Sequence, residues 1–200
     1  TAARRHSRRP VEKLTVEDVR RFLHYDPETG RFWWKLRSYH TFYGDKKIQK
    51  DRGKVWNQRF AGRRAFTARS LGYFVGQVVG CKVYAHRAAW MHYHGETIPE
   101  GMLIDHINGD KTDNRISNLR LVTRQQNTCN KPARGGTSQH KGVQWHKNAQ
   151  KWYASIRHGG KFRYLGLFQS EEEAAARYVQ EAETLQGEYA HHNSAGRSLK

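Results

Sequence analysis

Residues 104–110 read IDHINGD, and this stretch with the segment after it decides how the centre of the chain folds. Its apolar residues predict a strand over 103–106, and the Asn-Gly step inside it predicts a turn. The apolar run at 119–122 predicts the returning strand. A helix is expected to start within 124–131, so the centre is expected to be a hairpin followed by a helix.

Asp105 and His106 stand at the end of the first of these strands. Neighbouring strand residues point to opposite faces, so the two side chains can share a site only if the backbone bends, as residues 107–110 allow. Phosphodiester hydrolysis needs a base that activates water, a hard cation and a group that orients the base. Oxygen ligands from Asp105 and Asn127 suit magnesium, or else manganese, better than zinc. An Asp-His pair alone is a weak signal, and it gains weight from the later Asn118 and Asn127.

Over about residues 71–131 the sequence resembles the HNH endonuclease family, especially its phage and intron-encoded members. Besides the residues above, the resemblance rests on His86-Arg87 at a helix start and on Asp113-Asn114-Arg115. The family fold is a β-hairpin and a helix that hold one metal ion. His86 itself is expected to pack near the hairpin rather than to act in catalysis.

The resemblance implies roles by position. Asp105 and Asn127 would be metal ligands, and His106 the general base. Asn118 would orient His106 through its loop. The last family position is often His, and Asn there resembles the homing branch in which a monomer nicks one strand.

Three arginines of this segment are candidate phosphate contacts, although each is equally compatible with a solvated basic position: Arg115, Arg120 and Arg124. Only two cysteines are present, Cys81 and Cys129, so no structural zinc is expected and both are read as free thiols.

The composition indicates nucleic acid as the partner. The chain has 36 Lys+Arg against 18 Asp+Glu, a net charge of +18 and a pI near 10.2. Residues 1–70 carry a net +12, with 19 basic and 7 acidic side chains. No run of 18 apolar residues and no secretory segment is visible, so an intracellular protein with no membrane contact is expected. The resemblance to phage and intron-encoded endonucleases implies that a phage or mobile element in a bacterial host encodes it.

The C-terminal part predicts three strands, over 140–146, 151–157 and 161–167, and then a helix behind a capping box of Ser170 and Glu173. In the second strand Ala154 and Ile156 would face this helix, whose small residues 174–176 allow close approach. Tyr153, Ser155 and Arg157 would face the other way.

Over residues 139–193 this part resembles the APETALA/ethylene-response-factor DNA-binding domain. That family packs one helix across the back of a three-stranded antiparallel sheet, whose front enters the major groove. The resemblance places six residues at DNA contacts: Lys141, Gln144, His146, Ser155, Arg157 and Tyr164. The plant domains carry arginines on the first strand where this chain has Lys, Gln and His, so the recognised base sequence does not transfer.

The N-terminal third predicts a helix from a Thr15 cap through His24, a turn at 26–30 and an aromatic run at 31–35. The run could stack on bases, but a small core is favoured. Residues 38–64 lack a pattern and are expected to be a loop-rich, phosphate-contacting region. A resemblance to leaders found ahead of HNH modules is weaker and implies no chemistry.

We therefore expect an α+β protein: a ββα-metal (His-Me finger) nuclease module and a three-stranded antiparallel sheet with one packed helix. The expected segments are a basic N-terminal segment (1–70), the nuclease module (71–131), a linker (132–138), the DNA reader (139–193) and a tail (194–200). The expected function is metal-dependent cleavage of double-stranded DNA by a monomer that requires no protein partner. A transcription regulator with an inactive nuclease scaffold, an RNA-processing or non-specific nuclease and a nucleoid protein are the alternatives.

Overall fold

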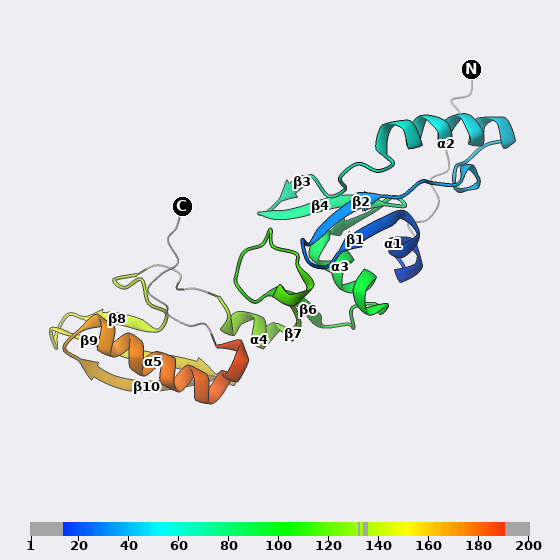
Figure 1. Ribbon diagram of the computed structural model, residues 1–200. Coiled ribbons are helices and arrows are strands. Elements are labelled where there is room, and N and C mark those ends of the chain that lie inside the picture. Colours follow the sequence, from blue (N-terminus) through cyan, green and yellow to red (C-terminus); the bar gives the residue numbers. More distant parts are fainter. Residues whose placement is uncertain (1–13, 132, 134–135, 191–200) are drawn as a thin grey trace, which may run out of the picture. The chain divides into compact units, whose positions relative to one another are not determined.

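The computed structural model describes residues 14–131, 133 and 136–190. The predicted arm at 1–10, parts of the predicted linker and reader (132, 134–135 and 191–193) and the tail lie outside the described residues. The chain divides into two compact units, Thr1–Leu121 and Val122–Lys200, and each is described by itself (Figure 1).

The first unit begins with a helix and a hairpin that share its core. Helix α1 (Val16–Phe22) starts at the predicted cap, where Thr15 and Asp18 form a capping box. Strands β1 (Leu23–Asp26) and β2 (Arg31–Trp34) pair antiparallel across the turn at 27–30. Phe32 is almost fully buried in the core, which confirms a packing role for this residue of the aromatic run.

The prediction of a loop at 38–64 was wrong, because this region contains η1 (Tyr39–Thr41) and the 15-residue helix α2 (Lys46–Phe60). Asp45 caps α2, and the helix buries only Gly53, so it shows no apolar periodicity. Trp56 anchors it instead, since the guanidinium of Arg37 lies 4.0 Å from the Trp56 ring centroid. Burial lowers the pKa of Arg37 to about 10.

The centre of the unit contains a three-stranded antiparallel sheet and the predicted hairpin. The sheet has the order β3-β4-β5, and its strands are β3 (Ala68–Ser70), β4 (Tyr73–Val78) and β5 (Cys81–Tyr84). Helix α3 (Ala85–His94) follows and ends at Gly95 in the left-handed conformation. The hairpin consists of β6 (Met102–His106), η2 (Ile116–Asn118) and β7 (Leu119–Thr123).

One core unites these parts. Val19 and Phe32 from the N-terminal elements cluster with Val78, Ala88 and Leu119. Residues before 71 therefore fold together with the hairpin instead of forming a separate layer.

The second unit contains the short helix α4 (Arg124–Cys129) and a sheet with one helix against it. The antiparallel sheet has the order β10-β9-β8, with β8 (Val143–His146), β9 (Lys151–His158) and β10 (Lys161–Phe168). Helix α5 (Glu171–Gln186) packs on it and is followed by η3 (Gly187–Tyr189).

Two details of this unit differ from the prediction. Ala176 lies on the exposed side of α5, so the close approach to the sheet rests on Ala174 and Ala175. The capping box is incomplete, because the Glu173 carboxylate accepts from Gln169 N, while Ser170 Oγ accepts from Glu173 N. Within the described ranges no helix has the length and apolar character that crossing a bilayer requires.

Candidate active site and nucleic-acid interface

His106 ends β6 and is held by a hydrogen bond. It is 4 % exposed, and its Nε2 lies 3.1 Å from the Asn114 Oδ1. Asn114 Nδ2 donates to Thr112 O (3.3 Å), which leaves Oδ1 to face the imidazole. Because a carbonyl oxygen only accepts, Nε2 carries the ring proton and Nδ1 carries the lone pair. Burial lowers the pKa of His106, against the opposing effects of Asn114 and Asp105, and so favours the neutral imidazole that a general base needs.

Asn118 ties together the loop that follows His106. Its Oδ1 accepts from Asn108 N (2.9 Å), and its Nδ2 donates to Asn108 Oδ1 (3.0 Å) and to Asp113 O (2.8 Å). Its own carbonyl accepts from Ile107 N (2.9 Å). One side chain thus fixes both ends of the loop directly after His106.

Asp105 makes a buried ion pair with Arg120. Nε and Nη2 of Arg120 both lie 3.0 Å from the Asp105 Oδ2. Arg115 likewise pairs with Asp113, 2.6 Å apart. Of the three arginines predicted near DNA, two therefore have acidic partners, and the third, Arg124, is exposed at the start of α4.

The two predicted metal ligands belong to different units, Asp105 to the first and half-buried Asn127 on α4 to the second. Their donor atoms are oxygens, and the Asp105 carboxylate is already next to a cationic group. Oxygen donors suit a hard divalent cation, which commonly takes one or two protein oxygens and completes its shell with water and phosphate. The Arg120 guanidinium competes for the Asp105 carboxylate, so a cation bound there would have to displace it. In the described ranges no three or more His, Cys, Asp or Glu side chains gather where they could hold a metal ion.

His86 is buried behind His106. Its ring centroid lies 5.2 Å from that of His106 and 5.0 Å from that of Tyr73. Burial, with the nearby His106 and Arg87, lowers the pKa of His86 to about 3. Its Nδ1 is buried without a hydrogen-bond partner among the described residues.

The N-terminal hairpin supports the loop that carries Asn114. Tyr25 Oη donates to Asn114 O (2.7 Å), and Ile116 N donates to Pro27 O (3.1 Å). Gly30 has a φ of 67°, and a Cβ there would overlap the backbone of Asn114 and Arg115. Sequence reasoning assigned no role to Asn114 or Tyr25; the polar Asp113-Asn114-Arg115 segment was the only available signal.

The second unit brings five of its six predicted DNA contacts to one face. Strand register places Gln144 opposite Tyr153, Ser155 opposite Tyr164 and Arg157 opposite Phe162. His146, opposite Lys151, shares this face, whereas Ala154 and Ile156 point into the core against α5.

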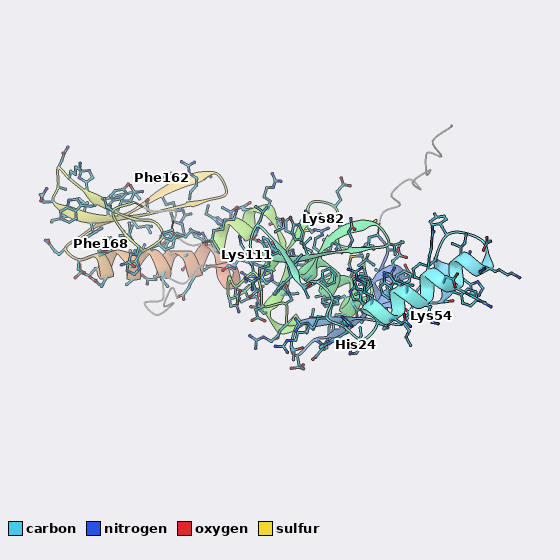
Figure 2. All side chains as sticks on the ribbon, turned by 90° about the horizontal axis from the view of Figure 1, so that it is seen from above. His24, Lys54, Lys82, Lys111, Phe162 and Phe168 are labelled. Atoms are coloured by element: carbon cyan, nitrogen blue, oxygen red, sulfur yellow. The ribbon has the colours of Figure 1, made fainter. Side chains whose placement is uncertain are left out.

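Exposed aromatic side chains lie among these polar residues. Phe162 is 59 % and Tyr164 57 % exposed, and Phe162 is labelled in Figure 2. Tyr153 Oη donates to Gln144 Oε1 (2.7 Å). Lys141, the sixth predicted contact, instead donates to the carbonyls of Thr128 (3.2 Å) and Cys129 (2.6 Å) in α4.

A buried His, an Asn oxygen that faces its ring nitrogen and a second Asn that ties the following loop together form one polar site on a hairpin. Residues 83–129 match the family model described as HNH endonuclease, so this segment is similar to the HNH endonuclease domain. No solved structure matches the chain significantly.

Two curated relatives extend this similarity. An uncharacterized HNH endonuclease of Acanthamoeba polyphaga mimivirus is 38% identical over 120 residues, covering 60% of this chain and 61% of the relative. Protein 3.8 of Escherichia phage T7 is 35% identical over 77 residues, covering 38% of this chain and 63% of the relative. The aligned region thus spans about three fifths of the length of each relative.

Proposed function

We propose that this protein is a metal-dependent endonuclease that cuts double-stranded DNA at a preferred site. The observation that carries the proposal is the buried His106, held 3.1 Å from the Asn114 oxygen inside the segment that matches the HNH endonuclease family. The net charge of +18 supports a polyanionic substrate.

In the proposed mechanism the Nδ1 lone pair of His106 takes a proton from the attacking water. Burial keeps the imidazole neutral, Asn114 orients it, and Asn118 holds the loop that limits its movement. Asp105 and Asn127 would hold the cation, magnesium or else manganese. When bound, the cation supplies positive charge that stabilises the transition state and the departing oxygen.

Arg120 and Arg115 are each paired with an acid, so their proposed contact with DNA phosphate requires an exchange of partners. Arg124 is exposed and needs no such exchange. For Lys141 we propose a structural role, because its ammonium joins α4 to the segment before β8.

The face of the second sheet is proposed to read DNA in the major groove. Gln144, His146, Ser155, Arg157 and Tyr164 share this face, and a sheet face can present such side chains to base edges. This supports an APETALA/ethylene-response-factor type of reader, which would hold a site while the nuclease acts nearby.

A monomer that nicks one strand is proposed on the presence of Asn127 where the family often has His. The viral and phage relatives support a phage or mobile-element origin, with homing as the proposed biological role and the inside of a host cell as its setting.

The test is incubation of supercoiled plasmid with magnesium, with manganese and with chelator. Metal-dependent conversion to open circles is expected, whereas linear product would contradict nicking. A protein that shifts DNA on a gel but never cuts it would overturn the proposal in favour of a regulator.

A further inference from the structure

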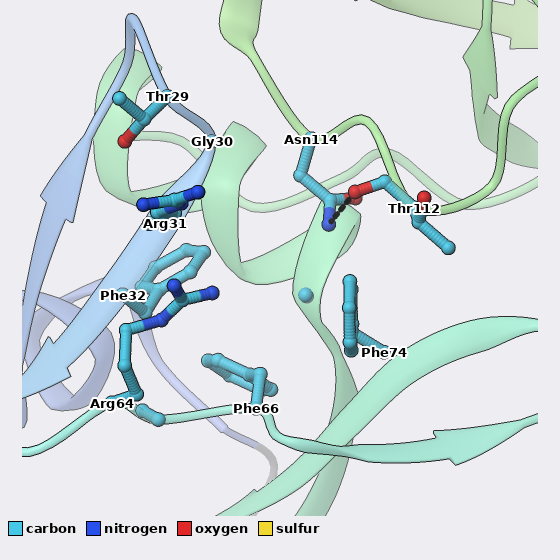
Figure 3. Close-up of a pocket in the computed structure, with 11 residues that line it drawn as sticks. Thr29, Gly30, Arg31, Phe32, Arg64, Phe66, Phe74, Thr112 and Asn114 are labelled. Carbon is cyan, nitrogen blue, oxygen red and sulfur yellow. Dashed lines mark hydrogen bonds between the residues drawn. The ribbon is translucent and has the colours of Figure 1, made fainter.

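A small pocket opens in the first unit beside the loop that carries Asn114 (Figure 3). Its volume is ≈ 230 Å³. Pockets that enclose drug-sized ligands start at roughly 300 Å³, so this one suits a single small unit of a longer molecule.

The pocket has an aromatic interior. Phe32 and Phe66, almost fully buried in the core, form its floor with ring centroids 4.9 Å apart, and half-buried Phe74 lines it as well. A flat ring that enters here would meet phenyl groups, the surface on which nucleobases stack regardless of their sequence.

Two arginines stand at its exposed edge. Figure 3 shows Arg31 and Arg64 across the pocket from Phe74 and Asn114. The backbone on both sides of Arg64 is held by hydrogen bonds to β2. Ala65 N donates to Phe32 O (2.9 Å), and Trp34 N donates to Arg63 O (3.0 Å). Neither Arg31 nor Arg64 takes part in any ion pair found among residues 14–131, 133 and 136–190. Paired guanidinium groups above an aromatic interior suit phosphate at the edge and a base inside.

The pocket is also connected to the proposed general base through one side chain. Asn114 lines it, and the same side chain accepts from His106 Nε2. A group in the pocket is therefore one side chain away from the proposed general base.

We propose that this pocket holds one unstacked nucleotide of the DNA strand close to the phosphate that is cut, with its base against the phenyl rings and its phosphate on Arg31 and Arg64. The proposal rests on the proposed function. It implies that the enzyme distorts its substrate, and that an unpaired base at this position binds more tightly because no base pair must be opened.

The test uses the full chain with His106→Ala, so that DNA stays intact, and duplexes in which 2-aminopurine replaces one base in turn along the strand. Its fluorescence rises when the probe leaves the base stack. A rise of severalfold at one position is expected, together with about tenfold tighter binding when that position is mismatched. Adding Arg64→Gln should remove the rise, whereas adding Arg63→Gln, which removes the same charge from the exposed neighbour outside the pocket, should keep it.

The experiment distinguishes failure of the pocket proposal from failure of the proposed function. If the wild-type chain nicks the unlabelled duplex but the probe stays silent everywhere, or if its rise survives Arg64→Gln, the pocket proposal is overturned and the proposed function stands. If the wild-type chain neither nicks nor binds the duplex, both fall. An Arg64-dependent rise without nicking supports the pocket and overturns the nuclease. Thermal melts of both arginine variants verify that they fold.

Discussion

The hairpin of the first unit and the sheet of the second unit use polar side chains in opposite ways. Around β6 and β7, His106, Asn114 and Asn118 are buried and bonded to one another or to their own loop. On the second sheet, Gln144, Arg157 and Tyr164 stand exposed on one face. A buried hydrogen-bond network holds each side chain in one position, which a catalysed reaction requires. Exposed side chains can instead adjust to the groove of a DNA duplex.

The largest effect is expected from His106→Ala, which tests whether the buried site carries the chemistry. Loss of a general base typically costs about 100-fold to 10,000-fold in rate, so nicking should vanish while DNA binding stays. Plasmid nicking and gel shifts measure the two properties, with exposed His94→Ala as the control. Normal nicking by the variant would mean that His106 is not the base.

Asn118→Ala tests whether the buried network is also structural. It leaves Asn108 N and Asp113 O without their partner, so the free energy of unfolding should fall by about 1–3 kcal/mol. Urea titration measures the loss, and nicking should slow as the loop loosens. The exposed neighbour Ser117→Ala should change neither, and an unchanged stability of the Asn118 variant would count against the network.

Arg157→Ala addresses the exposed face. Removing one base or phosphate contact should weaken binding at the preferred site by about 1–3 kcal/mol without changing the nicking rate at saturating DNA. Arg163→Ala, whose guanidinium pairs with Glu181 on α5, is the matched control. Equal losses of affinity in the two variants would contradict reading by this face.

The last prediction concerns the pH dependence of stability. His86 stays neutral in the folded protein down to a pH of about 3, whereas in the unfolded chain it takes up a proton below about 6.5. The unfolded state therefore binds more protons in this window, and the free energy of unfolding should fall as the pH is lowered, by at most about 1.4 kcal/mol per pH unit. Urea midpoints across the window should fall less steeply in His86→Gln than in the exposed control His24→Gln. Parallel slopes would contradict this role of His86.

The sequence predicted the elements that carry local signals. The Thr15 cap marks the start of α1, and the alternation around Ala154 and Ile156 predicts the inward side of β9. Helix α2 escaped prediction because it is held by Trp56 and Gly53 rather than by an apolar stripe. The partner of His106 escaped too, since the approach of Asn114 depends on the path of a loop fixed by Tyr25, 89 residues away in the sequence.

Gly30 bears on how this protein could be truncated and rebuilt. Its bare α-carbon lets the N-terminal hairpin lie directly on the Asn114–Arg115 backbone, and Tyr25 and Pro27 bond to the same loop. A truncated protein that starts at residue 71 would lack the hairpin that supports the Asn114 loop and, through it, His106. A transferable version of the domain should therefore begin ahead of Thr15. Gly30→Ala should also slow the proposed nicking, because its methyl group would displace the Asn114 loop without contacting a reacting atom.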